Sequence, residues 1–215
     1  YGQRYDAAGN PVGGNFIIND TLSGLHRYGC DPKAAFLPGG GFVATWYGYD
    51  FSWNGHVYAQ LFDASGDTVG GNFEVGDGSG SEYVSDVAAS DSGFMITWYD
   101  YRNGNSDIYA QRYKSNGEAV GGNFLVDDGG NNQYAPRIAS NGSGYVIAWY
   151  DDRSGNWDIY AQRFDVNGDT LGGNFLVDDG GYYQYEPSVA MADSGFVITW
   201  YDYRYDGGYS DIYAQ

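Results

Sequence analysis

The fold is decided by the segment WYDDRSGNWDIYAQ at Trp149–Gln162, because closely similar segments occur elsewhere in the chain. Two of them are Trp98–Gln111 and Trp200–Gln215, and a weaker copy is Trp46–Gln60. Self-similarity at a fixed spacing is typical of repeat architectures, in which each unit buries its apolar faces against its neighbours. The chain of 215 residues is therefore a tandem-repeat protein, and we expect it to form a single domain.

A second motif, Gly-Gly-Asn-Phe, gives the length of the unit. It begins at Gly13, Gly70, Gly121 and Gly172, which are 57, 51 and 51 residues apart. Each unit contains four short apolar segments that are rich in β-branched and aromatic residues and are bounded by glycine-rich turns, a pattern that indicates strands. No segment keeps a 3.6-residue apolar period, so we expect helix to be nearly absent.

Four strands in about fifty residues is the arithmetic of a β-propeller blade. The sequence therefore predicts an all-β, four-bladed β-propeller made of four repeats of about 51 residues, each with outer, inner, second and third strands in chain order. A β-sandwich or an open solenoid could be built from the same meanders. The predicted domain covers residues 1–215, with units at approximately 12–63, 69–114, 120–165 and 171–215 and a terminal strand at 1–9.

The two termini both carry the third-strand motif, so this strand is split between them. Residues 1–18 are expected to form a hairpin that completes a blade either in the same molecule or in the next one; alternatively, the chain is a piece of a longer array. Unpaired strand edges are templates for strand addition, so head-to-tail assembly is physically reasonable. The predicted assembly residues are Tyr1, Gln3, Tyr5, Phe16, Ile212 and Tyr213.

The loops between second and third strands and those between outer and inner strands are expected at the same end of the propeller. This end would be acidic and aromatic, and exposed aromatic rings beside carboxylates are a common way to hold sugars, with several equivalent positions giving multivalency. The predicted ligand-binding residues are Trp53, Trp157, Tyr101, Tyr203, Tyr209, Asp128 and Asp179.

The loop motif itself, Asp-x-Arg followed by a second Asp, predicts a charge-assisted hydrogen-bond network that fixes the loop. The residues concerned are Asp100, Arg102 and Asp107, then Asp151, Arg153 and Asp158, and then Asp202, Arg204 and Asp211. In the first unit Gly48, Asp50 and His56 stand at these three positions. Joint loss is expected of one network, because a lone buried charge is costly.

The pattern Asp-x-Arg-x-Gly-x-x-Asp-Ile-Tyr at Asp151–Tyr160 resembles the TolB-type propeller repeats of secreted and cell-surface bacterial proteins. Three of the four units match, so the resemblance covers most of the chain. It implies an extracellular or cell-surface β-propeller used for binding or assembly. The motif identifies a type of blade and names no activity.

The Asp-Asp-Gly-Gly turns could offer carboxylate oxygens to calcium, which prefers several oxygen ligands. The candidate ligands are Asp127, Asp128, Asp178 and Asp179. Neither an EF-hand spacing nor a Gly-Gly-x-Gly-x-Asp repeat accompanies them, and Asp and Gly are also the ordinary residues of tight turns. Apart from calcium, no cofactor is expected.

Composition narrows the function classes further. With 28 acidic and 10 basic residues the formal charge is −18, which disfavours binding to nucleic acid and insertion into anionic membranes. One cysteine excludes an internal disulfide framework. The chain has two histidines and lacks Gly-x-Ser-x-Gly, His-Glu-x-x-His and phosphate-loop motifs, so the sequence predicts that the protein is not an enzyme.

Two hypotheses follow from these observations. The first is a non-enzymatic extracellular structural protein that forms filaments end to end by strand complementation, with other copies of itself as its partner. The second is a multivalent, lectin-like propeller that binds surface glycans through its acidic aromatic loops. The sequence does not choose between them.

Overall fold

The computed structural model describes residues 1–19, 29–127, 129–204 and 209–215. These residues form strands and loops without a helix, so the described part of the chain contains no helix that could cross a membrane. The strands are β1 (Gly2–Tyr5), β2 (Pro11–Phe16), β3 (Gly29–Phe36), β4 (Phe42–Tyr49), β5 (Gly55–Phe62), β6 (Thr68–Glu74), β7 (Glu82–Ser90), β8 (Gly93–Asp100), β9 (Asp107–Lys114), β10 (Ala119–Leu125), β11 (Gln133–Ser140), β12 (Gly144–Asp151), β13 (Asp158–Asp165), β14 (Phe175–Leu176), β15 (Gln184–Ala192), β16 (Gly195–Asp202) and β17 (Asp211–Ala214).

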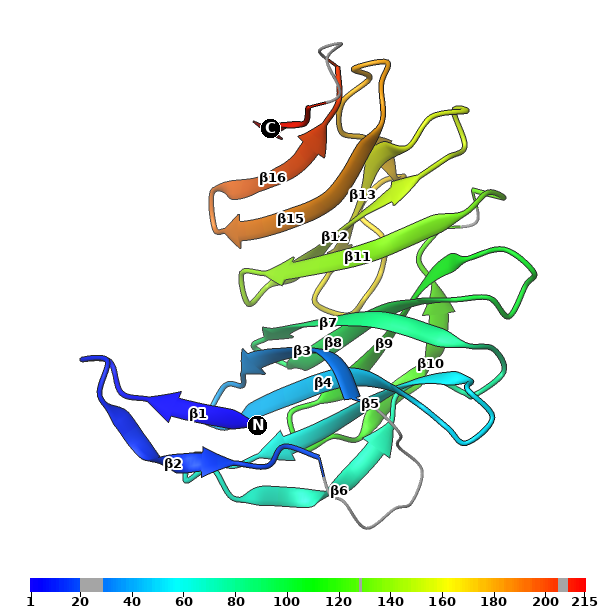
Figure 1. The fold of residues 1–215 in the computed structure, drawn as a ribbon. Coiled ribbons are helices and arrows are strands. Elements are labelled where there is room, and N and C mark those ends of the chain that lie inside the picture. Colours follow the sequence, from blue (N-terminus) through cyan, green and yellow to red (C-terminus); the bar gives the residue numbers. More distant parts are fainter. Residues whose placement is uncertain (20–28, 128, 205–208) are drawn as a thin grey trace.

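The strands form five antiparallel sheets that follow one another along the chain. β3–β6, β7–β10 and β11–β14 are four-stranded meanders, β15–β17 is a three-stranded meander, and β1–β2 is a hairpin. The first strand of each meander lies beside the first strand of the next, so β3, β7, β11 and β15 form the inner side of the stack (Figure 1). The prediction of an all-β chain is confirmed, and the sheets are arranged as successive propeller blades.

The Gly-Gly-Asn-Phe segment closes a blade and does not open it. For example, β10 contains Gly121–Phe124 and pairs with β9, the third strand of the preceding sheet. The repeat counted from this motif therefore joins the outer strand of one blade to the inner three strands of the next. This offset is invisible in the sequence, because a tandem repeat can be counted from any of its strands.

The N-terminal hairpin packs against the first complete blade and does not pair with β17. The Phe16 ring lies 5.5 Å from the Phe62 ring, and Arg4 Nη2 donates to Ala64 O at 2.8 Å. Arg112 in β9 makes the corresponding contact with Asn167 of the following blade. The hairpin thus occupies the position of a preceding, partial blade, and the described strands form an open arc of sheets without a closed ring (Figure 1).

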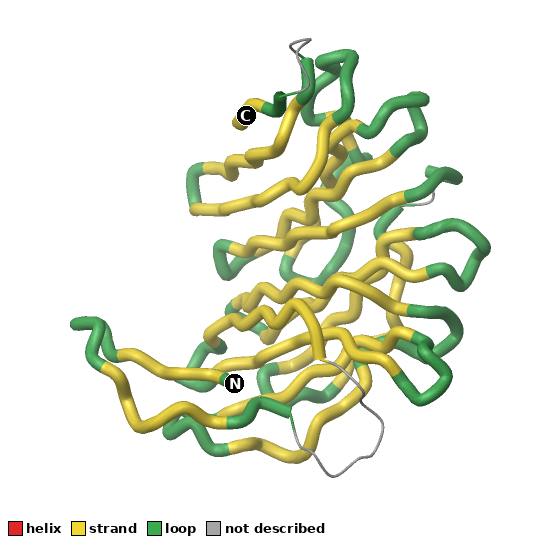
Figure 2. Tube along the Cα trace, viewed as in Figure 1, coloured by secondary structure: helices red, strands yellow, loops and turns green. Residues whose placement is uncertain are grey.

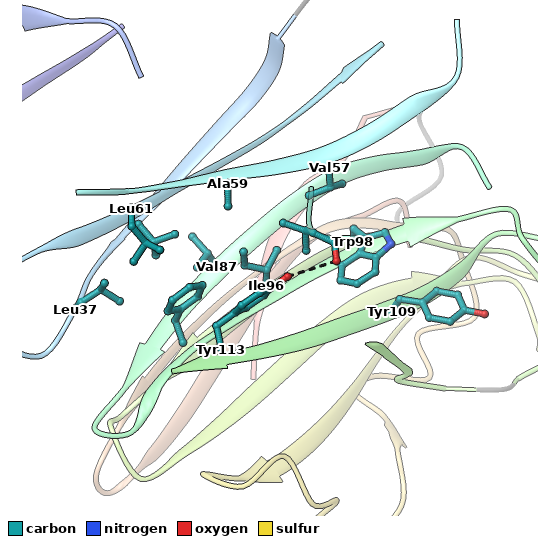
Figure 3. Close-up of a cluster of buried hydrophobic side chains, with 12 residues drawn as sticks. Leu37, Val57, Ala59, Leu61, Val87, Ile96, Trp98, Tyr109 and Tyr113 are labelled. Carbon is teal, nitrogen blue, oxygen red and sulfur yellow. Dashed lines mark hydrogen bonds between the residues drawn. The ribbon is translucent and has the colours of Figure 1, made fainter. Parts of the chain in front are cut away.

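Apolar side chains from facing sheets fill the space between blades. Val57, Ala59 and Leu61 of β5 meet Ile96 and Trp98 of β8 in one buried cluster (Figure 3). They can do so because alternate residues of a strand point to the same face, so each blade presents one row of these side chains to its neighbour. Two further clusters of the same kind join the second blade to the third and the third to the fourth.

The last blade leaves one apolar face uncovered. Ile159 in β13 is 0% exposed beneath the fourth blade, whereas Ile212, at the same position of the repeat in β17, is 66% exposed. Val146 and Val197 differ in the same way, at 0% and 42% exposed. Equal residues at equal repeat positions therefore differ only in whether a following blade covers them.

This difference gives a matched test of blade packing. The substitution Ile159→Ala should lower the free energy of unfolding by about 2 to 5 kcal/mol, because it removes buried methyl groups and leaves a cavity. The substitution Ile212→Ala should change it by less than about 0.5 kcal/mol, because the side chain is already in water. Urea unfolding of both variants measures this, and equal effects would contradict the arrangement of the blades.

Candidate functional site

One end of the blades carries all the loops singled out by the sequence. Each blade is an antiparallel meander, so the loops between second and third strands emerge at the same end as the loops between outer and inner strands (Figure 2). The inner strands also begin and the second strands end here. Side chains from four elements of each blade therefore meet at this end.

An Asp–Arg pair fixes the second-to-third-strand loop of the second blade. Arg102 Nη2 lies 2.6 Å from Asp100 Oδ2, and Arg102 Nη1 donates to Asp77 at 2.8 Å and to Asn123 at 3.0 Å. The guanidinium also lies 3.9 Å from the centre of the Tyr109 ring. Because Trp98 Nε1 donates to the same Asp100 at 3.1 Å, the carboxylate joins the loop to the core.

The third and fourth blades repeat this arrangement. Arg153 binds Asp151 and Asp127, and Arg204 binds Asp202 and Asp178. Burial acts to raise the pKa of Asp202, but hydrogen bonds from Arg204 and Trp200 bring it below its usual value.

The second Asp of the motif lies outside these pairs. Asp107 accepts hydrogen bonds from Asn103 and Asn105, and Asp158 accepts one from Ser154. Asp211 is exposed at the start of β17. The network thus joins the first Asp and the Arg of each loop to an Asp from the preceding outer-to-inner loop.

Two of the calcium candidates lie within this network. Asp127 is 5% exposed and is bonded by Arg153, Gln133 and Asn174, while Asp178 is bonded by Arg204. Their carboxylates thus already have cationic or amide partners. Asp179 is exposed in the same loop as Asp178, and Asp128 lies outside the described residues. Calcium binding by these turns stays a prediction.

Aromatic rings form a continuous band across the blades at the loop-bearing end. Tyr47 contacts Tyr83 at 5.9 Å between ring centres, Tyr99 contacts Tyr134 at 5.1 Å, and Tyr150 contacts Tyr185 at 5.3 Å, and each of these contacts crosses from one blade to the next. The members of this aromatic band are Tyr47, Tyr49, Trp53, Tyr83, Tyr99, Tyr101, Tyr134, Tyr150, Trp157, Tyr183, Tyr185 and Tyr203.

Four of the predicted ligand-binding residues belong to the band. Trp53 is 56% exposed, Tyr101 41% and Tyr203 38%, and Trp157 lies against Tyr134 and Tyr150. Tyr209 is 83% exposed in the last loop. The sequence analysis missed Tyr83, Tyr134 and Tyr185 as ligand-binding candidates, although a tyrosine at the start of three inner strands is a visible signal.

Three of the four inner strands carry a charged side chain at one repeat position, and the fourth carries a serine. Lys33, Asp86, Arg137 and Ser188 pair with equivalent residues of their second strands and so stand at the same repeat position. Arg137 Nη2 lies 3.6 Å from Glu186 on β15, and Asp86 on β7 accepts a hydrogen bond from Ile138 N at 3.1 Å. Two carboxylates therefore flank Arg137 from the neighbouring strands.

The environments of these two carboxylates differ. Burial raises the pKa of Asp86, although hydrogen bonds from Ile138 and Val87 act against this effect. Glu186 has a half-exposed side chain and a positive φ of 52° at a bulge in β15. The sequence analysis missed both, because the repeats carry different residues at these positions and no motif marks them.

The first blade lacks the Asp–Arg pair. His56 Nδ1 lies 2.7 Å from Glu74 Oε1, and the buried Glu82 accepts hydrogen bonds from Val57 N at 3.0 Å and Gly78 N at 3.3 Å. Burial raises the pKa of Glu82 to about 7. Its equivalents Gln133 and Gln184 accept the same backbone hydrogen bond through a neutral amide.

Comparisons with known proteins identify the fold. No family model and no curated protein sequence matches the chain, so the resemblance to TolB-type repeats stays a prediction. Among solved structures, an endo-arabinase from Bacteroides thetaiotaomicron is 12% identical with a TM-score of 0.60, covering 95% of this chain and 80% of that one. A thermostable family-43 glycoside hydrolase is 16% identical with a TM-score of 0.54, covering 86% and 70%. The catalytic domain of a family-62 α-L-arabinofuranosidase from Coprinopsis cinerea is 11% identical with a TM-score of 0.53, covering 94% and 68%.

These comparisons contradict the predicted function. The three solved structures named above are glycoside hydrolases, and their families have five-bladed propellers. This finding contradicts the predictions of a non-enzymatic filament protein and of no enzyme activity. The proposed homopolymer has no support either. Of its six assembly residues, Tyr1, Tyr5 and Ile212 are exposed, Gln3 donates to Arg4 O, Phe16 packs on the first blade, and Tyr213 stacks on Trp200.

The raised pKa of Glu82 predicts a pH-dependent loss of stability. An unfolded Glu loses its proton near pH 4.5, whereas folded Glu82 keeps it until about pH 7, so the free energy of unfolding should fall as pH rises between these values. The substitution Glu82→Gln removes this loss and should stabilise the protein by up to about 3 kcal/mol above pH 8. Urea unfolding of both proteins at pH 5 and pH 8 checks this, and parallel pH profiles would refute it.

Proposed function

We propose that this chain is a carbohydrate-active propeller that binds a glycan along the aromatic band. The observation that carries the proposal is the unbroken series of ring contacts from Tyr49 in the first blade to Tyr203 in the fourth. Tyrosine and tryptophan present an apolar face with a polar edge, which suits a sugar ring that has apolar faces and hydroxyl groups at its rim. The likeness to glycoside hydrolases shows the shared fold and agrees with this class of ligand.

The repeated arrangement favours a polymer over a single sugar. Equivalent rings recur in successive blades, so neighbouring residues of one chain can each meet a similar surface, and linked contacts strengthen one another. The charge of −18 disfavours polyanionic ligands and leaves neutral glycans as the favoured class. We extend the proposal to an extracellular or cell-surface location, where such polymers occur.

Asp86 and Glu186 give this surface a means of cleaving a glycosidic bond. Glycoside hydrolysis requires one carboxylic acid that protonates the leaving oxygen and one carboxylate that activates a water molecule or attacks the anomeric carbon. Burial keeps Asp86 protonated to higher pH, which suits the acid, and the exposed Glu186 suits the base. Arg137 Nη2 lies 3.6 Å from Glu186 Oε2 and can hold this carboxyl group in position.

Glycan binding is tested by removing one ring from the middle of the band. The substitution Trp157→Ala should weaken retention of arabinan in affinity electrophoresis by about tenfold, equivalent to about 1.4 kcal/mol, because the stacked face is lost. Tyr5→Ala is the matched control, since Tyr5 is 62% exposed on the N-terminal hairpin and lies outside the band. Equal losses in both variants, or no retention by the unaltered protein on arabinan and cello-oligosaccharides, would refute the proposal.

Hydrolysis is tested separately through the two carboxylates. The unaltered protein should release reducing ends from arabinan, and Asp86→Asn and Glu186→Gln should each lower that rate by about 10² to 10⁴-fold, the usual contribution of general acid–base catalysis. Both variants should still be retained on the polymer. Asp169→Asn, an exposed acid in the loop at the opposite end of the third blade, serves as control. Unchanged rates in the two carboxylate variants would contradict their assignment.

A further inference from the structure

The boundary between the first and second blades differs from the later boundaries at three positions that lie together in space. His56, Glu74 and Glu82 place one nitrogen and two carboxylate oxygens within 4.8 Å of one another. The corresponding residues are Asp107, Leu125 and Gln133 at the boundary between the second and third blades, and Asp158, Leu176 and Gln184 at the boundary between the third and fourth. One imidazole and two carboxylates thus stand in place of a carboxylate, an apolar side chain and an amide.

These replacements bring two carboxylates together without a guanidinium. In the other blades an arginine neutralises the Asp residues, but Asp50 stands at the arginine position of the first blade, 3.6 Å from His56 Nε2. Glu82 is 0% exposed, and it sits where Gln133 donates a hydrogen bond from its amide. Glu74 beside it is partly exposed, and a second carboxylate next to a buried one favours a positive partner.

Buried polar groups next to this cluster also lack partners. Trp46 is 4% exposed, and its indole Nε1 has no hydrogen-bond partner among the described residues, since Gly48 stands where the second blade has the Asp that accepts from Trp98. Gly48 pairs directly with His56 across β4 and β5. The unpartnered indole N–H is therefore aimed into the space beside the imidazole.

Asn72 gives a second, independent sign of a missing group. Both polar atoms of its side-chain amide are buried, and neither has a hydrogen-bond partner in the part of the chain that the structure describes. Its equivalents Asn123 and Asn174 accept hydrogen bonds from Arg102 and Arg153. In the first blade Asp50 stands at the arginine position, so the guanidinium that binds this Asn in the other blades is missing. A bound cation would supply the missing positive charge.

We propose that His56, Glu74 and Glu82 bind a divalent metal ion of the zinc class. A neutral imidazole with two carboxylates is a ligand set that suits zinc and its neighbours, whereas calcium prefers oxygen ligands throughout. Two ligands of one zinc ion lie up to about 4 Å apart, because each bond is about 2 Å long. Small side-chain adjustments therefore bring the three donors onto one ion.

The surrounding groups complete the site. Asp50 faces the ring nitrogen of His56 opposite Glu74 and orients the imidazole, as carboxylates beside metal-bound histidines do. Trp46 Nε1 would be available to donate to a water molecule on the ion, and the side-chain carbonyl of Asn72 would be available to supply a further oxygen. The ion would link β5 and β6 of the first blade to β7 of the second. It would thus connect the first and second blades where the first blade lacks the Asp–Arg pair.

The experiment measures metal retained by the whole chain after dialysis against zinc and then against metal-free buffer. The unaltered protein should retain about one zinc ion per chain by elemental analysis, and cobalt in its place should give a visible d–d absorption. His56→Asp, Glu74→Leu and Glu82→Gln each introduce the residue found at the same position of the two later blade boundaries. The fold is therefore expected to persist. Each should lower zinc affinity at least tenfold.

The control variant is Glu118→Gln. It removes an exposed acid that pairs with Lys114 at the β9–β10 turn of the second blade, away from the three proposed ligands. It should retain zinc as the unaltered protein does. Absence of retained zinc, retention of calcium in preference to zinc, or zinc retention that survives all three restoring substitutions would each overturn the proposal. Circular dichroism measured in parallel checks that every variant is folded.

Discussion

The burial of one apolar sheet face against the next is the constraint on which the structure depends. A meander of four strands has two faces, and neither is covered until another sheet packs on it. The side chains at Val57, Ile108 and Ile159 show the outcome, since each is 0% exposed under the following blade. The same position at Ile212 has no following blade and stays in water. Stability therefore accumulates at the interfaces between blades, as expected of a quasi-one-dimensional repeat protein.

The loop-bearing end is ordered by electrostatics that depend on this packing. The Trp98 and Asp100 pair illustrates the connection, because the indole belongs to the core between blades and its N–H reaches the carboxylate that holds Arg102. A charge-assisted pair of this kind is stabilising only where every member is bonded. The first blade has neither the Asp nor the Arg. The groups equivalent to those that the Asp and the Arg bind in other blades, at Trp46 and Asn72, have no partner among the described residues.

The features that recur in every repeat could be predicted from the sequence, and the features that depend on contacts between blades could not. Strand type, the absence of helix and the shared end of the loops all follow from the spacing of glycine turns and from alternating apolar residues, which recur in every unit. The position of the hairpin could not be predicted. It depends on contacts of Phe16 and Arg4 with the first blade, and no local sequence pattern indicates these contacts. The strand at which a blade begins could not be predicted either, because a tandem repeat can be counted from any of its strands.

The prediction of no enzyme activity relied on missing motifs, and a motif search does not find a site that is made of single departures from a repeat. Catalytic acids and bases need unequal environments, and a repeat can supply them through the few positions at which its copies differ. Asp86, Arg137 and Ser188 occupy one repeat position with three different side chains, and Glu82 replaces the Gln of the later blades. A repeated scaffold fixes the backbone at such positions, so a single substitution can create an asymmetric site without changing the packing around it. The residues proposed for hydrolysis and for metal binding are therefore ones that depart from the repeat, whereas the aromatic band proposed to bind the glycan follows it.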